Sequence, residues 1–317
     1  MISGCYSLTS QPGVLPVFLS SENGDPGLKY FPLKAEGFAG GYYLHDRLPL
    51  TQGDFFYSDA AADILVLFSG YIYNKKELAT ASGVAASAPE PVIAAGLFLA
   101  EGLDFVRNLN GDFAIFICRP AARQAYLFRD HTGIRPMAWT LHGGNLFFSS
   151  DVRELSRFAA GGRGPETTWL TGYFRYVDFK EAPCRNVQRL LPGHYLEYTR
   201  KGIRMTRYWD PEKITTDRRM DYDTMISDLR QLVSDAVAIR CDRRFSAGSH
   251  VSSGLDSGMV ATLARSGYRS QPVFYGYSWS PGGFTAPKIP YDERDLVRSL
   301  CTAAGITPVF SAITPRE

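Results

Sequence analysis

Apolar residues in the first two hundred positions come in short runs that are typical of β-strands. Ile64–Phe68 (ILVLF) is wholly apolar, while GDFAIFICRP, QAYLFRD and GNLFFSS are wholly apolar or alternate between apolar and polar residues. Such runs, joined by short polar turns, predict strands buried in sheets. Ala88–Gly102 has helical spacing and ends at a glycine. HYLEYTRKGIRMTRYWD predicts a hairpin that turns at Lys201-Gly202.

The pattern changes in the last third of the chain. From Asp221 to Cys241 apolar residues recur at helical spacing on one face, namely Met225, Leu229, Leu232, Val233 and Ala236. The segments SHVS, SGMVATLARSG, PVFYGYSW and DERDLVRSLCTAAG then alternate between strand and helix patterns. This alternation is typical of βαβ units on a parallel sheet. We therefore predict two domains, a strand-rich α+β domain over residues 1–210 and an α/β domain over residues 221–317.

Composition narrows the classes of partner. The 317 residues carry 34 basic and 32 acidic side chains, and no run of Lys or Arg is long enough to follow a nucleic acid backbone. No apolar stretch reaches membrane-spanning length, and the first residues lack the pattern of a signal peptide. Five cysteines without C-x-x-C spacing argue against a disulfide framework or a zinc site. We expect a cytoplasmic protein that binds neither nucleic acid nor membrane.

The stretch VSSGLDSG, Val251–Gly258, joins a predicted strand to a predicted helix. A tight turn that opens a helix presents unpaired backbone N–H groups and the positive end of the helix dipole, which suits a phosphate group. Ser252, Ser253 and Ser257 add hydroxyl donors, and Asp256 is a carboxylate of the kind that holds Mg²⁺. The alternative interpretation is structural, because Ser and Asp are ordinary helix caps and Gly is an ordinary turn residue.

Several motifs, in order, resemble the asparagine synthetase family. SSGLDSG is similar to the family's pyrophosphate loop, SGGLDSS, and HDRLPL at His45–Leu50 is similar to HERLSI. FSGYIYNKKEL at Phe68–Leu78 is similar to FNGEIYNHxEL. LNGDFAIFICRPAARQAYLFRDHTGIRPMAW and LLPGHYLEY…RYWD also resemble family segments, so the resemblance covers essentially the whole chain.

The resemblance implies a fold and a chemistry. It implies an N-terminal αββα sandwich of the Ntn amidotransferase type, followed by an ATP pyrophosphatase domain with a parallel sheet. In this family a carboxylate is activated on the α-phosphate of ATP, pyrophosphate leaves, and an amine forms the amide. ATP and Mg²⁺ are thus the implied cofactors, with Asp256 as the metal ligand. The implied ATP contacts are Val251, Ser252, Ser253, Gly254, Leu255, Asp256, Ser257, Gly276 and Tyr277.

The resemblance fails at the glutaminase site. The family's nucleophile is a cysteine exposed as the first residue, whereas this chain begins Met1-Ile2, and Cys5 is interpreted as a structural residue of the first strand. The family's remaining glutamine contacts are replaced by Ser69, Tyr71 and Pro89. Arg47 alone matches, and we interpret it as a vestige with a surface or packing role. No catalytic residue is therefore expected within this chain.

The second domain also departs from the family pattern. Ser253 stands where the family has glycine, and Gly258 where it has serine. If the backbone at position 253 must be left-handed, the serine side chain would hinder the close approach of a phosphate. If it need not be, the serine hydroxyl would add a hydrogen-bond donor for the phosphate. Asp292 and Glu293 start the last predicted helix and are interpreted as caps. Family members continue for about another domain, with a second acidic motif that binds Mg²⁺. We expect a fragment with an incomplete parallel sheet that is inactive alone.

The function implied is an ATP-dependent, AMP-forming amide ligase. Without a glutaminase, the amine should already be on the substrate, a small-molecule or peptide carboxylate, as in the β-lactam synthetases and lasso-peptide cyclases that resemble this chain. YGYSWSPGGFTAPKIPYDERDLVRSLCTAAG favours the peptide cyclase, which would work with a peptide-processing partner. Two alternatives stay open, a relative of the glutamine-hydrolysing asparagine synthases that makes asparagine, and a non-catalytic remnant.

Overall fold

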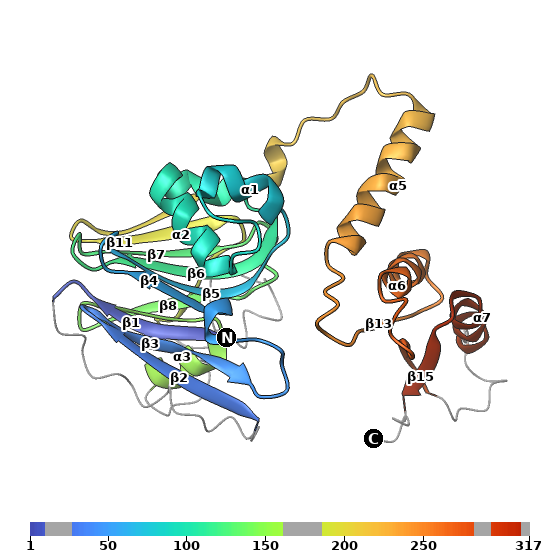
Figure 1. Ribbon diagram of the computed structural model, residues 1–317, viewed down its shortest axis with the longest axis horizontal. Helices are drawn as coiled ribbons and strands as arrows, with labels where there is room; N and C mark the ends of the chain where they lie inside the picture. The colour runs from blue at the N-terminus through green and yellow to red at the C-terminus, as the bar shows by residue number, and fades with distance from the viewer. Residues whose placement is uncertain (10–26, 161–185, 282–292, 312–317) are drawn as a thin grey trace. The chain divides into compact units, whose positions relative to one another are not determined.

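A computed structural model describes the chain except for residues 10–26, 161–185, 282–292 and 312–317. The chain divides into two compact units, Met1–Ile214 and Thr215–Glu317, each described separately below (Figure 1).

The first unit is built on two six-stranded sheets. One sheet has the order β10 (Gln188–Arg189), β8 (Ala138–His142), β9 (Asn145–Ser149), β1 (Ile2–Ser7), β3 (Phe38–His45) and β2 (Leu28–Ala35). The other has the order β12 (Gly202–Arg207), β11 (His194–Thr199), β7 (Gln124–Arg129), β6 (Gly111–Arg119), β5 (Ile64–Ile72) and β4 (Phe56–Asp59). The strand pairs within both sheets are antiparallel.

Helices cover the outer faces of the two sheets (Figure 1). Helices α1 (Lys75–Ser82) and α2 (Glu90–Glu101) and the 3-10 helix η3 (Gly102–Asn108) pack on the sheet that contains β5. Helix α3 (Val152–Ala160) packs on β8 and β9 of the other sheet. Short 3-10 turns, η2 (Gln52–Asp54) and η4 (Pro211–Lys213), lie outside these layers. The order helix, sheet, sheet, helix confirms the predicted αββα sandwich.

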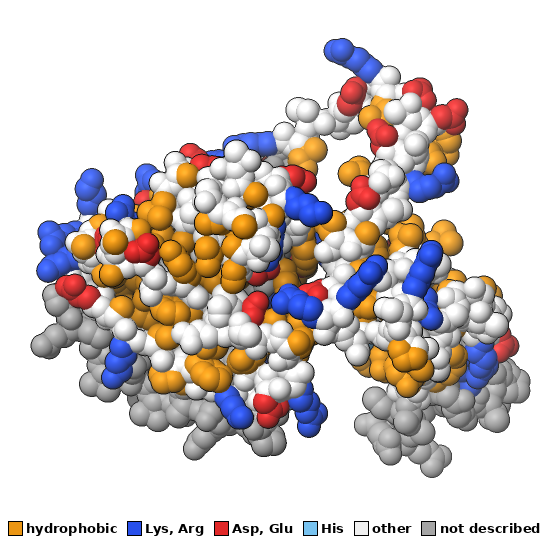
Figure 2. Space-filling view, viewed as in Figure 1, with side chains coloured by type: hydrophobic (Ala, Val, Ile, Leu, Met, Phe, Trp, Pro, Cys, Tyr) orange, Lys and Arg blue, Asp and Glu red, His pale blue; other side chains and the backbone are white. Residues whose placement is uncertain are grey.

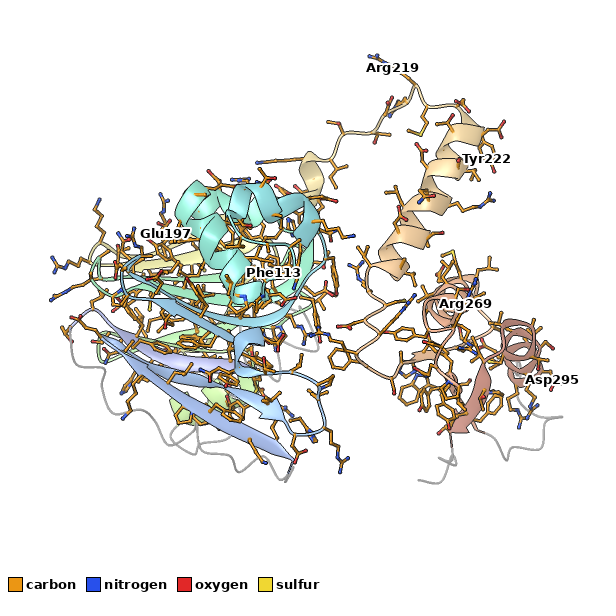
Figure 3. All side chains as sticks on the ribbon, viewed as in Figure 1. Phe113, Glu197, Arg219, Tyr222, Arg269 and Asp295 are labelled. Carbon is orange, nitrogen blue, oxygen red and sulfur yellow. The ribbon has the colours of Figure 1, made fainter. Side chains whose placement is uncertain are left out.

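Strand β6 shows why the apolar runs of this unit are continuous. Successive side chains of a strand point to opposite faces. Ala114 and Phe116 therefore lie in the core between the sheets, while Phe113 and Ile115 lie in the core under α1 and α2. Phe113 is labelled beneath these helices in Figure 3. Because both faces of the strand are covered, a run without polar alternation is the expected sequence.

Asp130 holds the turn after β7 together. The side chain is fully buried, and its carboxylate accepts N–H groups of Ile134 and Arg135, both at 2.9 Å, and of Phe113 at 3.3 Å. Gly133 in the same turn has φ +74°, a left-handed conformation that favours glycine. The RDHTGIRP segment therefore has a structural role in the fold of this unit.

The second unit is a three-stranded parallel sheet with helices. The strand order is β13 (Gly248–His250), β14 (Tyr275–Pro281) and β15 (Thr307–Ser311). Helix α6 (Leu255–Gly267) follows β13, and α7 (Arg294–Ala304) follows β14 along the chain. Their core contains Val251, Ala261, Phe274, Val297 and Ile306. The predicted parallel βαβ pattern is confirmed.

Helix α5 (Tyr222–Ala238) begins the second unit and is capped by Asp221, whose carboxylate accepts the Thr224 N–H at 2.9 Å. The predicted apolar face is present, but the described residues leave it uncovered. Leu229 and Leu232 are 54% and 67% exposed, and none of the helix's residues is buried. Tyr222 at its start is also largely exposed (Figure 3).

Candidate functional site

The turn between β13 and α6 places the Ser-rich loop at the carboxyl end of a parallel strand. The Val251 N–H donates to the Tyr277 carbonyl at 2.9 Å, which extends the β13–β14 pairing one residue beyond β13. Helix α6 starts at Leu255, two residues before the predicted start, with Gly254 at its N-cap. The loop therefore meets the first turn of α6, where helical N–H groups lack intrahelical acceptors.

Three consecutive backbone N–H groups of this loop have acceptors. The Ser252 N–H donates to Ser257 Oγ at 3.0 Å, and the Gly254 N–H donates to Ser252 Oγ at 3.2 Å. The two hydroxyls are 2.8 Å apart. The Ser253 N–H donates to Glu293 Oε2 at 3.1 Å. The loop thus has the N–H and hydroxyl groups that an anion needs, and each of these N–H groups already has a partner within the unit.

Glu293 was interpreted from the sequence as a helix cap, and the structure corrects this. Glu293 does stand at the N-cap of α7, but its side chain caps no N–H of that helix. The carboxylate reaches the loop before α6 instead. A contact between residues forty positions apart leaves no local signal, and the acidic pair before an apolar helix looks like an ordinary cap. Asp292, assigned the same role, lies outside the described residues.

The two substitutions in the loop have different explanations. Ser253 is not among the described non-glycine residues with positive φ, so a side chain there meets no left-handed backbone. Gly258 is buried in the contact between α6 and α7, where an added Cβ would lie 3.0 Å from Leu300 Cδ2. A serine at 258 would therefore force the side chain of Leu300 to move.

Asp256 lies in the first turn of α6 and is exposed. Among the residues that the structure describes, its carboxylate has no hydrogen bond or ion pair, and no group of three or more metal-ligating side chains occurs. A single free carboxylate beside the candidate phosphate loop fits one position of a Mg²⁺ shell, because Mg²⁺ commonly takes its other ligands from water and phosphate oxygens.

The predicted adenine contacts lie together beside the loop. Gly276 pairs with Ser249 in the parallel sheet, and Tyr277 accepts the Val251 N–H. A Cβ at Gly276 would lie 3.0 Å from Val251 Cγ2 and 2.8 Å from Ile306 Cγ2. Gly276 is thus needed for close packing and leaves only its backbone for a ligand, whereas Tyr277 is 46% exposed.

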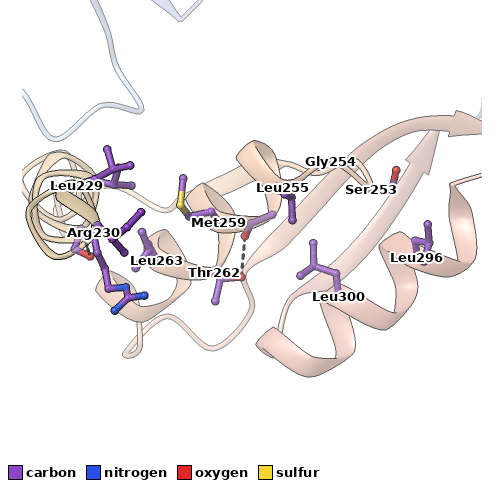
Figure 4. A pocket seen from close by; sticks show the side chains of 14 residues that line it. Leu229, Arg230, Ser253, Gly254, Leu255, Met259, Thr262, Leu263, Leu296 and Leu300 are labelled. Carbon is purple, nitrogen blue, oxygen red and sulfur yellow. Dashed lines mark hydrogen bonds between the residues drawn. The ribbon is translucent and has the colours of Figure 1, made fainter. Parts of the chain in front are cut away.

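An apolar groove of about 840 Å³ runs from the loop along α6, between α5 and α7. Leu229 of α5, Leu255 and Met259 of α6, and Leu296 and Leu300 of α7 line it (Figure 4). Hydrophobic side chains are also visible on the surface of this unit in Figure 2. Leu255, which directly precedes Asp256 in the first turn of α6, is 90% exposed. The groove has few polar groups and so favours an apolar occupant over the phosphates of a nucleotide.

The first unit has a cavity of about 210 Å³, lined in part by residues at two of the positions that the resemblance assigns to glutamine contacts. Ser69 and Tyr71 line it, together with Glu90 and Arg135. Pro89 is the N-cap of α2, at the edge of this region. Arg47 is exposed and is not one of the residues that line the cavity.

Two charged groups of this cavity already have partners. Glu90, only 5% exposed, forms an ion pair with Lys75 at 2.8 Å, and the Arg135 guanidinium lies 5.9 Å from the centre of the Tyr71 ring. Glu90 could not be singled out from the sequence, because an acidic residue at the first position of a helix is common for electrostatic reasons.

Cys5 does not face this cavity. It is fully buried in β1, where it packs with Ala138, Phe147 and Leu155 against α3. Burial raises the pKa of its thiol to about 12. Since the thiolate is the nucleophilic form, Cys5 cannot replace the missing glutaminase nucleophile.

Comparisons with known proteins place two family matches on the two units. Residues 48–209, just over half of the chain, match the glutamine amidotransferase domain, and residues 228–317 match asparagine synthase. Amidase chyE of Penicillium rubens is 32% identical over 188 residues, which are 55% of this chain and 27% of that protein. Asparagine synthetase [glutamine-hydrolyzing] 2 of Bacillus subtilis is 27% identical over 233 residues, 68% of this chain and 31% of that protein. The chain thus spans under a third of either relative.

Among solved structures, the glutamine phosphoribosylpyrophosphate amidotransferase from B. subtilis, complexed with ADP and GMP, aligns with 94% of this chain and 64% of its own. The TM-score is 0.41 and the sequence identity 11%. At this TM-score the likeness carries no argument, so the fold assignment rests on the sheets described above and on the family matches.

We predict that Cys5 resists alkylation in the folded protein. At pH 8 a thiol of pKa about 12 is ionised in roughly one molecule in ten thousand, and burial also blocks access. Peptide mass mapping after iodoacetamide treatment should find Cys5 unmodified until urea unfolds the protein, whereas the partly exposed Cys241 reacts in the folded state. Glutamate release from glutamine that a Cys5→Ser variant abolishes, and a Cys241→Ser variant does not, would contradict this assignment.

Proposed function

The chain belongs to the asparagine synthetase family, and from this premise we propose that it takes part in ATP-dependent amide formation. The observation that carries the proposal is the loop Val251–Gly258, which combines backbone N–H groups, serine hydroxyls and a free carboxylate at the end of a parallel strand. This loop lies within the asparagine synthase match. The structural interpretation also accounts for Asp256, because an acidic side chain in the first turn of a helix is stabilised by the helix dipole; the proposal therefore rests on the loop and the family match together.

The proposed reaction has two steps. A substrate carboxylate oxygen attacks the α-phosphorus of ATP, and the bond to pyrophosphate breaks. An amine then attacks the acyl carbon, AMP leaves with the bonding electrons, and the amine gives up a proton. The loop would act in the first step, because N–H and hydroxyl donors stabilise charge on the departing pyrophosphate. Mg²⁺ held by Asp256 would neutralise part of that charge. Val251 and Tyr277 would supply backbone contacts to adenine.

The first unit bears on where the amine comes from, because in this family an amidotransferase domain releases ammonia from glutamine. Cys5 is buried, and the cavity with Ser69 and Tyr71 has its acidic residue paired with Lys75. This unit therefore serves as a scaffold in the proposal and releases no ammonia. An amine carried by the substrate gains a large effective molarity over free ammonia, so intramolecular ring closure suits the site.

We propose a peptide macrolactam cyclase, of the type that closes lasso peptides, as the specific activity. The support is the resemblance of the segment from Tyr275 to Gly305 to that group, although residues 282–292 lie outside the described residues. The substrate would be a peptide with an N-terminal amine and an Asp or Glu side chain, delivered by a peptide-processing partner. The apolar groove beside the loop supports a bulky, partly apolar substrate or polypeptide rather than aspartate alone.

The site would be completed by further polypeptide, in the same or a second chain. The relatives above are about three times longer than the matched part. The exposed apolar residues of α5 are the surface on which such a polypeptide would pack. It would also supply the second carboxylate for Mg²⁺, and without it we expect this chain to be inactive.

Two other functions have some support. An asparagine synthase relative that uses ammonia is favoured by the matches to asparagine synthetases of B. subtilis. A non-catalytic remnant is favoured by the contact between Glu293 and the loop, which occupies an N–H group that a phosphate would need.

No helix among the described residues is long and apolar enough to cross a membrane. We propose a cytoplasmic location, with no nucleic acid partner.

We predict that Asp256→Asn weakens binding of ATP in the presence of Mg²⁺ at least about tenfold, equivalent to about 1.4 kcal/mol. The change removes one negative ligand and keeps the size of the side chain. Titration calorimetry on the complete protein measures the affinity with and without Mg²⁺. Asp223→Asn is the matched control, because Asp223 occupies the same second position in α5 and is also exposed. Equal losses in both variants, or none in either, would contradict the assignment of Asp256.

We predict that the complete protein, given ATP, Mg²⁺ and a precursor peptide with a free N-terminus and an acidic side chain, forms AMP and a cyclic peptide. The product should be lighter than the precursor by one water, which mass spectrometry detects. An acetylated N-terminus should abolish cyclisation, because the amine is then no longer a nucleophile. Formation of AMP that requires aspartate and ammonia, without a cyclic product, would identify an asparagine synthase relative instead.

A further inference from the structure

The contact between Glu293 and Ser253 is unusual for a residue at a helix start. An acidic N-cap ordinarily accepts an N–H from the second or third residue of its own helix. The Glu293 carboxylate instead accepts the Ser253 N–H at 3.1 Å, and so links the start of α7 to the loop before α6. Asp295 in the same helix turn pairs with Arg298 at 2.9 Å and has no contact with the loop. Figure 3 labels Asp295 on α7.

The acceptors on the loop differ in what they can do when an anion arrives. Ser252 Oγ and Ser257 Oγ accept the neighbouring N–H groups and are hydrogen-bonded to each other at 2.8 Å. A hydroxyl can rotate and turn its proton from such a bond toward a phosphate oxygen. An ionised carboxylate only accepts, and it repels a phosphate at short distance. Among the described residues, three side chains accept these three N–H groups or bond to their acceptors. Of these, Glu293 is the acceptor that would have to move away when a phosphate binds.

We propose that Glu293 occupies the anion position of the loop and that pyrophosphate or the phosphates of ATP must displace its carboxylate to bind. This inference rests on the proposed function of the loop as a nucleotide site. Glu293 then sets the affinity of the site for anions and couples phosphate binding to the start of α7. The hydrogen bond from Ser253 to Glu293 is the contact through which the start of α7 and the loop would act on each other.

The test compares binding of inorganic pyrophosphate and of ATP with Mg²⁺, by titration calorimetry on the complete protein, in the wild type, Glu293→Gln and Asp295→Asn. Glutamine keeps the shape of Glu293, lacks its charge and has an amide that can donate to a phosphate. Glu293→Gln should bind both ligands about tenfold more tightly, since a charge-assisted hydrogen bond no longer competes. Asp295→Asn removes the same charge from the same helix turn and should leave both affinities unchanged.

Three results would overturn the proposal. Equal affinities of the wild type and Glu293→Gln would show that the contact does not compete with the ligand, while leaving the nucleotide site intact. Weaker binding by Glu293→Gln, only in the presence of Mg²⁺, would make Glu293 a metal ligand. No binding of either ligand to any of the three proteins would exclude the nucleotide site itself, together with the role of Glu293.

Discussion

The candidate site depends on how the backbone N–H groups between β13 and α6 are satisfied. A parallel strand that runs directly into a helix leaves donors at the turn; Ser252 is half-buried, and Ser253 and Gly254 are exposed, yet all three donate to acceptors within the unit. Serine hydroxyls satisfy those of Ser252 and Gly254, and a carboxylate from the next helix satisfies that of Ser253. The same donors are those that would hold a phosphate. If the loop binds an anion as proposed, the anion and the Glu293 carboxylate compete for the Ser253 N–H group.

The sandwich of the first unit is held together independently of the side chains that line its cavity. Side chains of strands such as β5 and β6 point alternately into two hydrophobic cores. Packing of the two sheets therefore requires only that these strands keep their apolar residues. The cavity at Ser69 and Tyr71 survives as a space, but Glu90 is paired with Lys75, and Cys5 lies in another core.

The elements of the fold could be predicted from the sequence because their causes are local. Continuous apolar runs predicted buried strands, helical spacing predicted α5, and Lys201-Gly202 predicted the β11–β12 hairpin. The long-range pairs could not be predicted. Glu293 and Ser253 are forty residues apart, Lys75 and Glu90 are joined across a turn, and Gly258 is explained only by Leu300 in another helix. The apolar face of α5 was predicted from its spacing, but the spacing does not reveal that the described residues leave this face exposed.

The central claim is that the backbone of the loop is the phosphate site. The most direct measurement follows the amide signals of the complete protein in ¹H–¹⁵N spectra while ATP and Mg²⁺ are added. The account predicts that the Ser253 and Gly254 amides shift with the bound fraction and that the Glu293 signal moves with them, as its hydrogen bond to Ser253 is lost. An unchanged Ser253 amide at saturating ATP, with shifts confined to other parts of the chain, would contradict it.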